Sequence, residues 1–443
     1  MARTFISFLG TNDYIQCSYK FYNDIIENVR FVQEATIRLS CMEWSEDDKV
    51  IIFTTSDSFQ KNWKDDGHKD LKTGKVLDRT GLEKRINDLD LDCKWQQVLI
   101  PDGKTESEIW SIFSIVFEHI NQNDEIIFDI THAFRSIPIL TTVILNYARV
   151  IKDISLQGWF YGAMEAVGSF NDVKQMPIEK RIVPIFDLTS FDQLSEWSNG
   201  IDQFLTSGNA SRVTQLAEKS TVTILTRTKG RDLSQKKIKG FAKALDKFTK
   251  TLSTCRGRDI SYDAINLKQY LEDCRKIEFN NHLNKPLQPL FKKVKIQLAQ
   301  FEQSVVKDGI QAAKWCLAHN LIQQGYTILQ EVLITYFVTM IGKDPENFEN
   351  KNTNRTIASQ AIYIFLGNTP EKQWKKEAKN NKYLTDQYRN LFKKLNIGLL
   401  QTYRSLTDFR NDINHCGFNK SPKQPKNFAN KLEEFIFDIE NNI

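Results

Sequence analysis

Four short apolar runs near the N-terminus each end in a loop of polar or small residues, and this repeat constrains the fold more than any other feature. The runs cover residues 5–9, 50–53, 124–129 and 156–161, and helical periodicity separates them, for example over residues 30–42. Short apolar strands that alternate with helices are typical of an open parallel α/β sheet. We therefore predict such a sheet for the first part of the chain.

The loops after these runs form a candidate ligand site, because ligands of open parallel sheets bind beyond the carboxyl ends of the strands. Ser136 would begin a helix with Pro138 in its first turn, so backbone N–H groups would also face this crevice and favour phosphate. Neither G-x-G-x-x-G nor a Walker A motif occurs, which argues against a dinucleotide cofactor. The side chains that would reach phosphate or ribose are Thr11, Asn12, Thr54, Thr55, His132 and Arg135.

From about Asp187 the pattern is helical to the end of the chain. Residues 227–258 carry eleven Lys or Arg against two acidic residues. A solvated helix face is the more common explanation of such a run, and a path for RNA is the alternative. Residues 369–390, rich in Lys, Asn and Gln, are predicted to form an exposed insertion. The predicted helices begin with residues 192–206, 210–226, 233–253, 262–277 and 287–320.

The best candidate for chemistry is the hexapeptide at residues 410–415, which reads RNDINH. On a helix, the apolar residues Leu406, Phe409, Ile413 and Cys416 would share one side, and Gly417 would end the helix. The opposite, polar face would carry Arg410, Asn411, Asn414 and His415.

RNA can be cleaved without a metal by a permanent cation near the phosphorane and a group that moves a proton near neutral pH. Arg410 supplies the first and His415 the second, while Asn411 and Asn414 would orient the substrate. Arg followed by His at this spacing is expected about once by chance in a chain with six His. Arg410 and His415 do not lie on one ridge of the helix, so they would converge only if the long guanidinium folds round or if a second copy of the helix, in a homodimer, packs against the first.

The composition of the chain limits its expected location, its metal content and its nucleic-acid surfaces. No apolar run is long enough to span a membrane and no signal peptide is recognised, so a soluble, cytoplasmic protein without membrane association is expected. Seven Cys are scattered without metal-ligand spacing, which predicts reduced thiols and no metal site. The net charge of +5 is mild, so a nucleic-acid surface would have to be local.

Two stretches resemble a known family. Residues 129–138, which read DITHAFRSIP, are similar to the signature of the CARF sensor domain of CRISPR-associated proteins, and residues 10–12, Thr55 and residues 62–63 fall in matching order. Ala133 stands where that family usually has Gly. The resemblance implies that this domain is Rossmann-like and binds a cyclic oligoadenylate, with cyclic tetra-adenylate favoured and cyclic hexa-adenylate possible. The ligand-binding residues would be Gly10, Thr11, Asn12, Thr54, Thr55, Thr131, His132, Ala133, Phe134, Arg135, Tyr161 and Gly162.

Residues 315–317 and 323–324, together with residues 410–417, resemble the HEPN ribonuclease domain. The combination implies a CARF–HEPN ribonuclease, an accessory protein of type III CRISPR defence. It would cut single-stranded RNA without a metal or other catalytic cofactor and leave a 2′,3′-cyclic phosphate. We expect a homodimer, with a higher oligomer possible, and three domains in each chain: a CARF sensor at 1–188, a helical linker at 189–305 and a HEPN domain at 306–443.

Two other functions stay open. The chain could be a regulator without catalysis that reads the same nucleotide and binds nucleic acid through its basic helical region, although a pure binding module needs neither Arg410 nor His415. The N-terminal site could also degrade its own activator as a ring nuclease, an activity that is compatible with RNA cleavage elsewhere in the chain.

Overall fold

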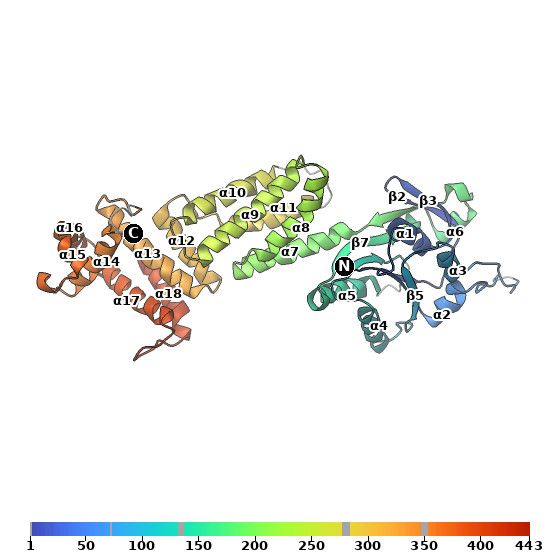
Figure 1. The fold of residues 1–443 in the computed structure, drawn as a ribbon, viewed down its shortest axis with the longest axis horizontal. Coiled ribbons are helices and arrows are strands. Elements are labelled where there is room, and N and C mark those ends of the chain that lie inside the picture. Colours follow the sequence, from blue (N-terminus) through green and yellow to red (C-terminus); the bar gives the residue numbers. More distant parts are fainter. Residues whose placement is uncertain (1, 71–72, 132–136, 277–283, 347–352) are drawn as a thin grey trace. The chain divides into compact units, whose positions relative to one another are not determined.

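The structure, a computed structural model, describes residues 2–70, 73–131, 137–276, 284–346 and 353–443 (Figure 1). The chain divides into two compact units, Met1–Gln193 and Leu194–Ile443, each with its own hydrophobic core. None of the described helices is both long and apolar enough to cross a membrane.

The first unit is built on one mixed sheet of eight described strands in the order β3-β2-β8-β7-β6-β1-β4-β5. All four predicted strand runs are strands of this sheet. The four runs do not include β2, β3, β5 or β8. Charged or amide side chains interrupt the apolar residues of β3 and β5, and Pro184 stands among those of β8. The strands are β1 Arg3–Leu9, β2 Cys17–Phe21, β3 Asp24–Val29, β4 Lys49–Thr54, β5 Lys94–Leu99, β6 Glu125–Asp129, β7 Ser155–Gly162 and β8 Ile182–Asp187.

The prediction of a purely parallel sheet is wrong at one edge. Strands β7, β6, β1, β4 and β5 are parallel neighbours, but β8 is antiparallel to β7 and β3 is antiparallel to β2. Parallel neighbours need a long crossover connection, whereas antiparallel strands need only a short one. Strands β2 and β3 are joined by a tight turn in which Tyr22 has a φ of +49°.

Helices cover both faces of this sheet, as expected for a Rossmann-like domain, so the predicted α/β class is confirmed. Side chains alternate along β1, so Phe5 packs toward helices α1 (Val32–Ser40) and α3 (Leu82–Asn87). Ile6 and Phe8 pack toward α4 (Glu106–Glu118) and α5 (Ile137–Lys152) on the other face. A sheet buried on both faces explains why its strands read as continuous apolar runs.

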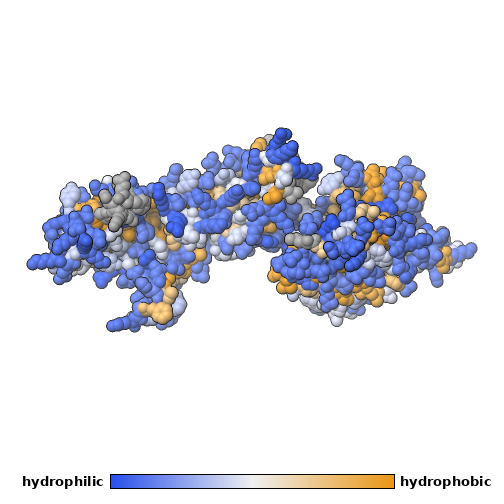
Figure 2. Space-filling view, viewed as in Figure 1, coloured by the Kyte–Doolittle hydropathy of each residue, from blue (hydrophilic) through white to orange (hydrophobic). Residues whose placement is uncertain are grey.

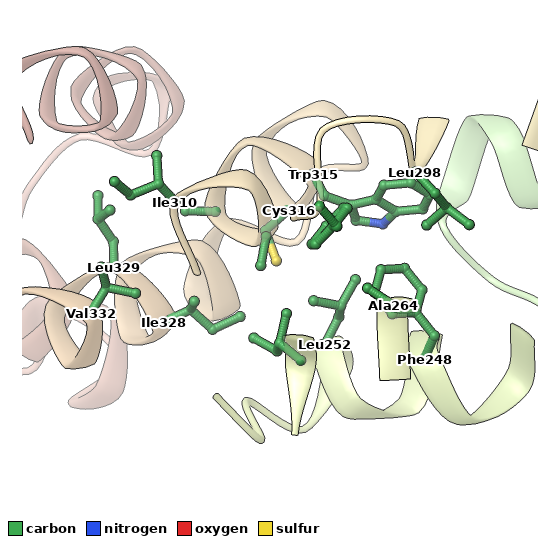
Figure 3. Close-up of a cluster of buried hydrophobic side chains, with 14 of the residues drawn as sticks. Phe248, Leu252, Ala264, Leu298, Ile310, Trp315, Cys316, Ile328, Leu329 and Val332 are labelled. Carbon is green, nitrogen blue, oxygen red and sulfur yellow. The ribbon is translucent and has the colours of Figure 1, made fainter. Parts of the chain in front are cut away.

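The second unit is helical, as predicted, and one core of buried residues extends from Trp197 to Ile439. Figure 3 shows Phe248 and Leu252 beside Trp315 and Cys316 in this core. The predicted boundary at residue 305 lies within this core, so the separation of a linker domain from a HEPN domain stays a prediction. The principal helices are α7 Thr189–Ser207, α8 Ser211–Arg227, α9 Leu233–Ser253, α10 Ile260–Arg275, α11 Asn284–Gln297, α12 Val305–Ala318, α13 Ile322–Met340, α14 Thr353–Leu366, α15 Lys376–Asn380, α16 Lys382–Phe392, α17 Ile397–Asn414 and α18 Lys426–Glu440.

Two details of the helical prediction are wrong. Residues 287–320 are not one helix, because the chain turns after α11 and Ser304 caps the start of α12. Residues 369–390 are not merely an exposed insertion, since Trp374 and Ala378 pack with Ile364, and Tyr388 lies in the main core. Their apolar residues are spaced one or more helical turns apart among Lys and Asn, which hides the buried face in the sequence.

Candidate functional site

The carboxyl ends of four parallel strands meet at one edge of the sheet, which we call the rim. Strands β7, β6, β1 and β4 are successive neighbours, so the loops that follow them lie side by side. His132, Ala133, Phe134 and Arg135 lie outside the described residues, and their role stays a prediction. The candidates placed at the rim are Gly10, Thr11, Asn12, Thr54, Thr55, Thr131, Tyr161 and Gly162.

A buried carboxylate, Asp129, joins two of these loops to the body of the domain. Its Oδ1 accepts hydrogen bonds from the N–H (3.0 Å) and the hydroxyl (2.6 Å) of Thr131, and its Oδ2 accepts from the hydroxyls of Ser7 (3.1 Å) and Thr36 (3.2 Å). Burial raises the pKa of Asp129, and the bonds from Thr131 oppose this shift. The Thr131 hydroxyl also accepts a bond from the Gly162 N–H at 2.8 Å, which links the ends of β6 and β7.

Asn62 fixes the loop that follows β1. This fully buried side chain donates from Nδ2 to the carbonyl oxygens of Gly10 and Asn12, both at 2.9 Å. Asn62 Oδ1 lies 2.9 Å from His68 Nε2. Because Nδ2 is occupied as a donor, His68 must carry its proton on Nε2. Asn62 thereby leaves Thr11 half-buried and Asn12 exposed at the rim.

The two threonines at the end of β4 support the rim from inside. Thr54 is fully buried and its hydroxyl accepts a hydrogen bond from Gln97 Nε2 at 2.6 Å. Thr55 caps α2 (Ser56–Ser58) and its hydroxyl accepts from the Ser58 N–H at 3.2 Å. Both hydroxyls are engaged inside the protein, so direct contact of either with a ligand stays a prediction that the geometry does not favour.

Tyr161 and Gly162 end β7 in different surroundings. The Tyr161 hydroxyl donates to Glu165 Oε1 at 2.5 Å, and burial followed by this bond raises the pKa of Tyr161 to about 12. A Cβ on Gly162 would lie 2.6 Å from Val32 Cγ2, so this position requires glycine for packing against α1. Close packing therefore accounts for Gly162 without a ligand.

In the second unit, α17 ends at the RNDINH hexapeptide. The helix stops at Asn414, His415 is its C-cap, and Cys416 (φ +54°) and Gly417 (φ +72°) form a left-handed turn. The Gly417 N–H donates to the Asp412 carbonyl at 2.9 Å, as expected for a glycine that ends a helix. The expectation that Cys416 packs on the apolar side is wrong, because the helix has ended and Cys416 is exposed.

Asp412, to which the sequence analysis gave no role, organises the loop after this turn. This residue is 7% exposed, and its carboxylate accepts hydrogen bonds from the N–H of Lys423 (3.0 Å) and from Asn419 Nδ2. These contacts hold the loop of residues 417–423 against the end of α17. The only sequence signal for this role is a short carboxylate next to a helix stop.

The four catalytic candidates are divided between two sides of this helix end. Asn411 and His415 line an open cavity of about 250 Å³. Arg410 does not line it, but Arg410 Nη1 donates to Asn411 Oδ1 at 3.4 Å, so Asn411 connects the cation with the cavity. Asn414 Oδ1 instead accepts from Gln323 Nε2 of α13 at 3.1 Å. The remaining cavity residues are Asp408, Asp412, Phe418, Asn419, Ser421 and Lys423.

A second cavity, of about 330 Å³, lies near Arg410. Burial raises the pKa of Cys255, which lines this cavity, and the positive charges of Arg256 and Arg410 oppose the shift. Arg410 Nε is buried and has no hydrogen-bond partner among the described residues. The apolar lining residues of this cavity include Ile260, Val305, Ile328 and Val332, and the polar ones include Arg258, Thr327, Glu331, Thr335 and Arg355.

The described parts of the chain contain no cluster of three or more His, Cys, Asp or Glu side chains arranged to hold a metal ion. The absence of a metal from catalysis nevertheless remains a prediction.

The described chain thus combines a Rossmann-like domain that has a polar rim with a helical unit. Residues 4–165 match the family model described as "CRISPR system endoribonuclease Csx1, CARF domain". The chain is also 24% identical over 269 residues to "CRISPR-associated protein MJ1674" of Methanocaldococcus jannaschii, a match that covers 60% of this chain and 37% of that protein. The predicted CARF domain is thereby confirmed over residues 4–165, and this part of the chain is similar to the CARF domain of a family of CRISPR-associated proteins.

These matches do not extend to every part of the predicted protein. The matched family model ends at residue 165, before the helical unit begins. The chain spans little more than a third of the length of its curated relative. The HEPN assignment and all ligands, substrates and partners are therefore matters of proposal.

Proposed function

We propose that this protein is a cytoplasmic ribonuclease of type III CRISPR defence whose CARF domain senses a cyclic oligoadenylate and whose α17 end cuts single-stranded RNA. The observation that carries the proposal is the cavity at the end of α17, where Asn411 connects the Arg410 guanidinium with exposed His415. A sensor domain needs an effector, and at this helix end Asn411 joins the cation of Arg410 to the cavity that His415 lines.

The rim suits a ligand made of ribose and phosphate. The backbone carbonyl groups of Gly10 and Asn12 are held in place by Asn62, and Thr131 is held by Asp129. Groups that are already fixed in place lose little conformational entropy when a ligand binds, and this favours affinity. Arg135 would add charge to this site. The preference for cyclic tetra-adenylate over cyclic hexa-adenylate rests on the family resemblance alone.

Cleavage would follow an in-line attack of the 2′-oxygen on the adjacent phosphorus. The bond from phosphorus to the 5′-oxygen breaks, which leaves a 2′,3′-cyclic phosphate and a 5′-hydroxyl. Arg410 stabilises the negative charge on the phosphorane oxygens, and His415 transfers a proton in the same step. Asn411 and Asn414 orient the substrate. Single-stranded RNA fits best because in-line attack needs a backbone free of A-form geometry.

An apolar surface on the first unit supports a homodimer. Helices α4 and α5 expose Trp110 (62%), Ile139 (72%), Val143 (49%) and Val150 (78%). In Figure 2 apolar atoms gather at the lower edge of this unit, where Figure 1 shows α4 and α5. Contiguous apolar patches of this kind mark association surfaces, and a two-fold dimer buries the same patch on both copies.

A charge placed in this patch tests the dimer. Val150→Asp is expected to convert the dimer to a monomer in sedimentation velocity, since a carboxylate would be buried without a partner. Val222→Asp, at an exposed valine of α8, is the matched control and should leave the mass unchanged. Equal masses for the parent and both variants would contradict the assignment of this interface.

The ribonuclease is tested with a fluorescent single-stranded RNA in EDTA, incubated with cyclic tetra-adenylate, with cyclic hexa-adenylate or with neither. Cleavage should require one of the two rings and His415, and should survive the chelator. A His415→Ala variant that cuts at the parent rate would refute the assigned chemistry. Tight binding of a ring without any cleavage would favour a regulator that lacks catalysis.

A further inference from the structure

Five lysines form a single stripe along α9. Lys236, Lys239, Lys243, Lys247 and Lys250 are spaced three or four residues apart. At about 100° and 1.5 Å per residue, this spacing puts them within about 80° of one another over a length of about 21 Å. We call this stripe the lysine ridge. The opposite side of α9 is buried and includes Phe241, Leu245 and Leu252.

The lysine ridge carries more positive charge than its neighbours neutralise. Lys247 Nζ pairs with Asp263 and Lys250 Nζ pairs with Asp246, each at 2.7 Å. Lys236, Lys239 and Lys243 have no ion pair with any described carboxylate, and each is exposed or half-buried. Figure 2 shows a mostly hydrophilic surface over α9 and α10. Three uncompensated charges in a row are suited to a polyanion.

An exposed aromatic ring stands beside the lysine ridge. Tyr262, in the first turn of α10, is 68% exposed, and Lys247 Nζ lies 5.2 Å from the centre of its ring. A cationic groove with an aromatic side chain is the usual platform for single-stranded nucleic acid, because unstacked bases can stack on the ring. A duplex presents no free base face and would gain nothing from Tyr262.

The lysine ridge ends at the catalytic end of α17. The last residue of α9, Ser253, accepts a hydrogen bond through its carbonyl from Gln324 Nε2 at 3.4 Å. The preceding residue, Gln323, donates to Asn414 Oδ1 at 3.1 Å. Consecutive glutamines of α13 thus connect the end of α9 with the catalytic helix. Cys255 and Arg258, just after α9, line the cavity of about 330 Å³ near Arg410.

We propose that the lysine ridge of α9 binds the backbone of the single-stranded RNA substrate and delivers it to Arg410, with Tyr262 as a stacking platform. The proposal rests on the ribonuclease function and extends it by locating the substrate path. A length of about 21 Å corresponds to about six phosphates of a stacked strand at 3.4 Å each. Substrates much shorter than this would therefore bypass the lysine ridge.

Binding is measured by fluorescence anisotropy of labelled single-stranded RNA in the full-length His415→Ala background. The ridge variant K236Q/K239Q/K243Q keeps the aliphatic stems and removes three charges, and K372Q/K376Q/K379Q removes three exposed charges near α15 as the matched control. The ridge variant should bind about tenfold more weakly or worse near 0.1 M salt, and its slope of log affinity against log salt should fall by about 2. Tyr262→Leu should weaken RNA binding about fivefold or more.

Several results would overturn the proposal. The first is unchanged RNA affinity of the ridge variant, and the second is an equal loss of RNA affinity in the matched control. The third is absence of RNA binding by the parent. The fourth is ridge-dependent binding that is tighter for duplex DNA than for single-stranded RNA, which would make α9 a duplex-binding surface. Failure of the ribonuclease itself is detected separately. It appears as absence of cleavage in the activated parent, whereas failure of the substrate path appears as normal cleavage of long RNA by the ridge variant.

Discussion

The rim of the CARF domain and the end of α17 are built in opposite ways. At the rim, the residues that hold the loops are fully buried, as Asp129 and Asn62 show. At the end of α17, a single buried carboxylate, Asp412, holds a loop whose tip includes Phe418 at 90% exposure, and His415 is exposed. One site is fixed by the interior of its domain, and the other depends on a loop and on groups that face outward.

This difference fits a sensor that is ready to bind and an effector that is incomplete. Preorganised donors favour affinity for a ligand. The proposed catalytic site, in which Arg410 lies outside the cavity lined by His415, would need a further group or a rearrangement before it could cut RNA. A second copy of the chain, or a shift in population caused by the ligand, would supply it. The predictions below probe this contrast, beginning with the largest expected effect.

Loss of the proposed catalytic groups should affect only the effector. Arg410→Ala and His415→Ala are each expected to lower RNA cleavage by about 10²- to 10⁴-fold, because each removes one element of transition-state stabilisation or proton transfer. Affinity for the cyclic oligoadenylate should be unchanged. Arg404→Ala, at an exposed position of the same helix, is the control and should cut normally. A loss of activator affinity in either variant would contradict the division of labour.

Asn62→Asp should damage the sensor instead. The change replaces two donated hydrogen bonds by a carboxylate that faces the carbonyl oxygens of Gly10 and Asn12. A cost of about 1–3 kcal/mol would raise the activator concentration needed for half-maximal cleavage by about 5- to 150-fold. The rate at saturating activator should approach that of the parent. Asn87→Asp, at an exposed residue, serves as the control. Equal shifts in the activator concentration for both variants would show that Asn62 does not hold the rim.

Asp412→Ala should make the loop after α17 more mobile without removing a proposed catalytic group. The loop of residues 417–423 loses two hydrogen bonds to the carboxylate, so its amide hydrogens should exchange faster. Cleavage should fall by about tenfold because His415 is less well positioned. Glu433→Ala removes an exposed carboxylate of α18 as the control. Normal exchange in this loop would show that Asp412 does not hold it.

The smallest effect concerns the charge of Asp129. Since burial raises the folded-state pKa of this carboxyl, its protonated form is favoured in the folded domain. Its contribution to stability is therefore complete below the unfolded-state pKa and is lost as pH rises through the folded-state pKa. Asp129→Asn lacks this dependence, so amide protection in β1 and β6 should rise relative to the parent as pH increases through the acid range. A pH-independent difference would show that the pKa of Asp129 is not raised.

Local patterns in the sequence predicted most of the secondary structure. The four apolar runs became β1, β4, β6 and β7, and α9 has the predicted bounds of residues 233–253. Strand β8 was missed because Pro184 stands inside its apolar run, and the buried face of α16 was missed because charged and amide side chains separate its apolar residues. The carboxyl ends of the four strands were located to within one residue because polar or small residues follow them, whereas α17 ends at Asn414, before the predicted stop at Gly417.

The sequence by itself determined the class of each half of the chain and the position of the RNDINH hexapeptide, because period and end signals are local. Only the tertiary structure decided which strands are neighbours, with β8 between β2 and β7, and which side chains support the candidate sites. Ser7 meets Asp129 across 122 residues, and Gln323 meets Asn414 across 91 residues. Contacts at such separations depend on how whole elements pack, and no local pattern of residues encodes them.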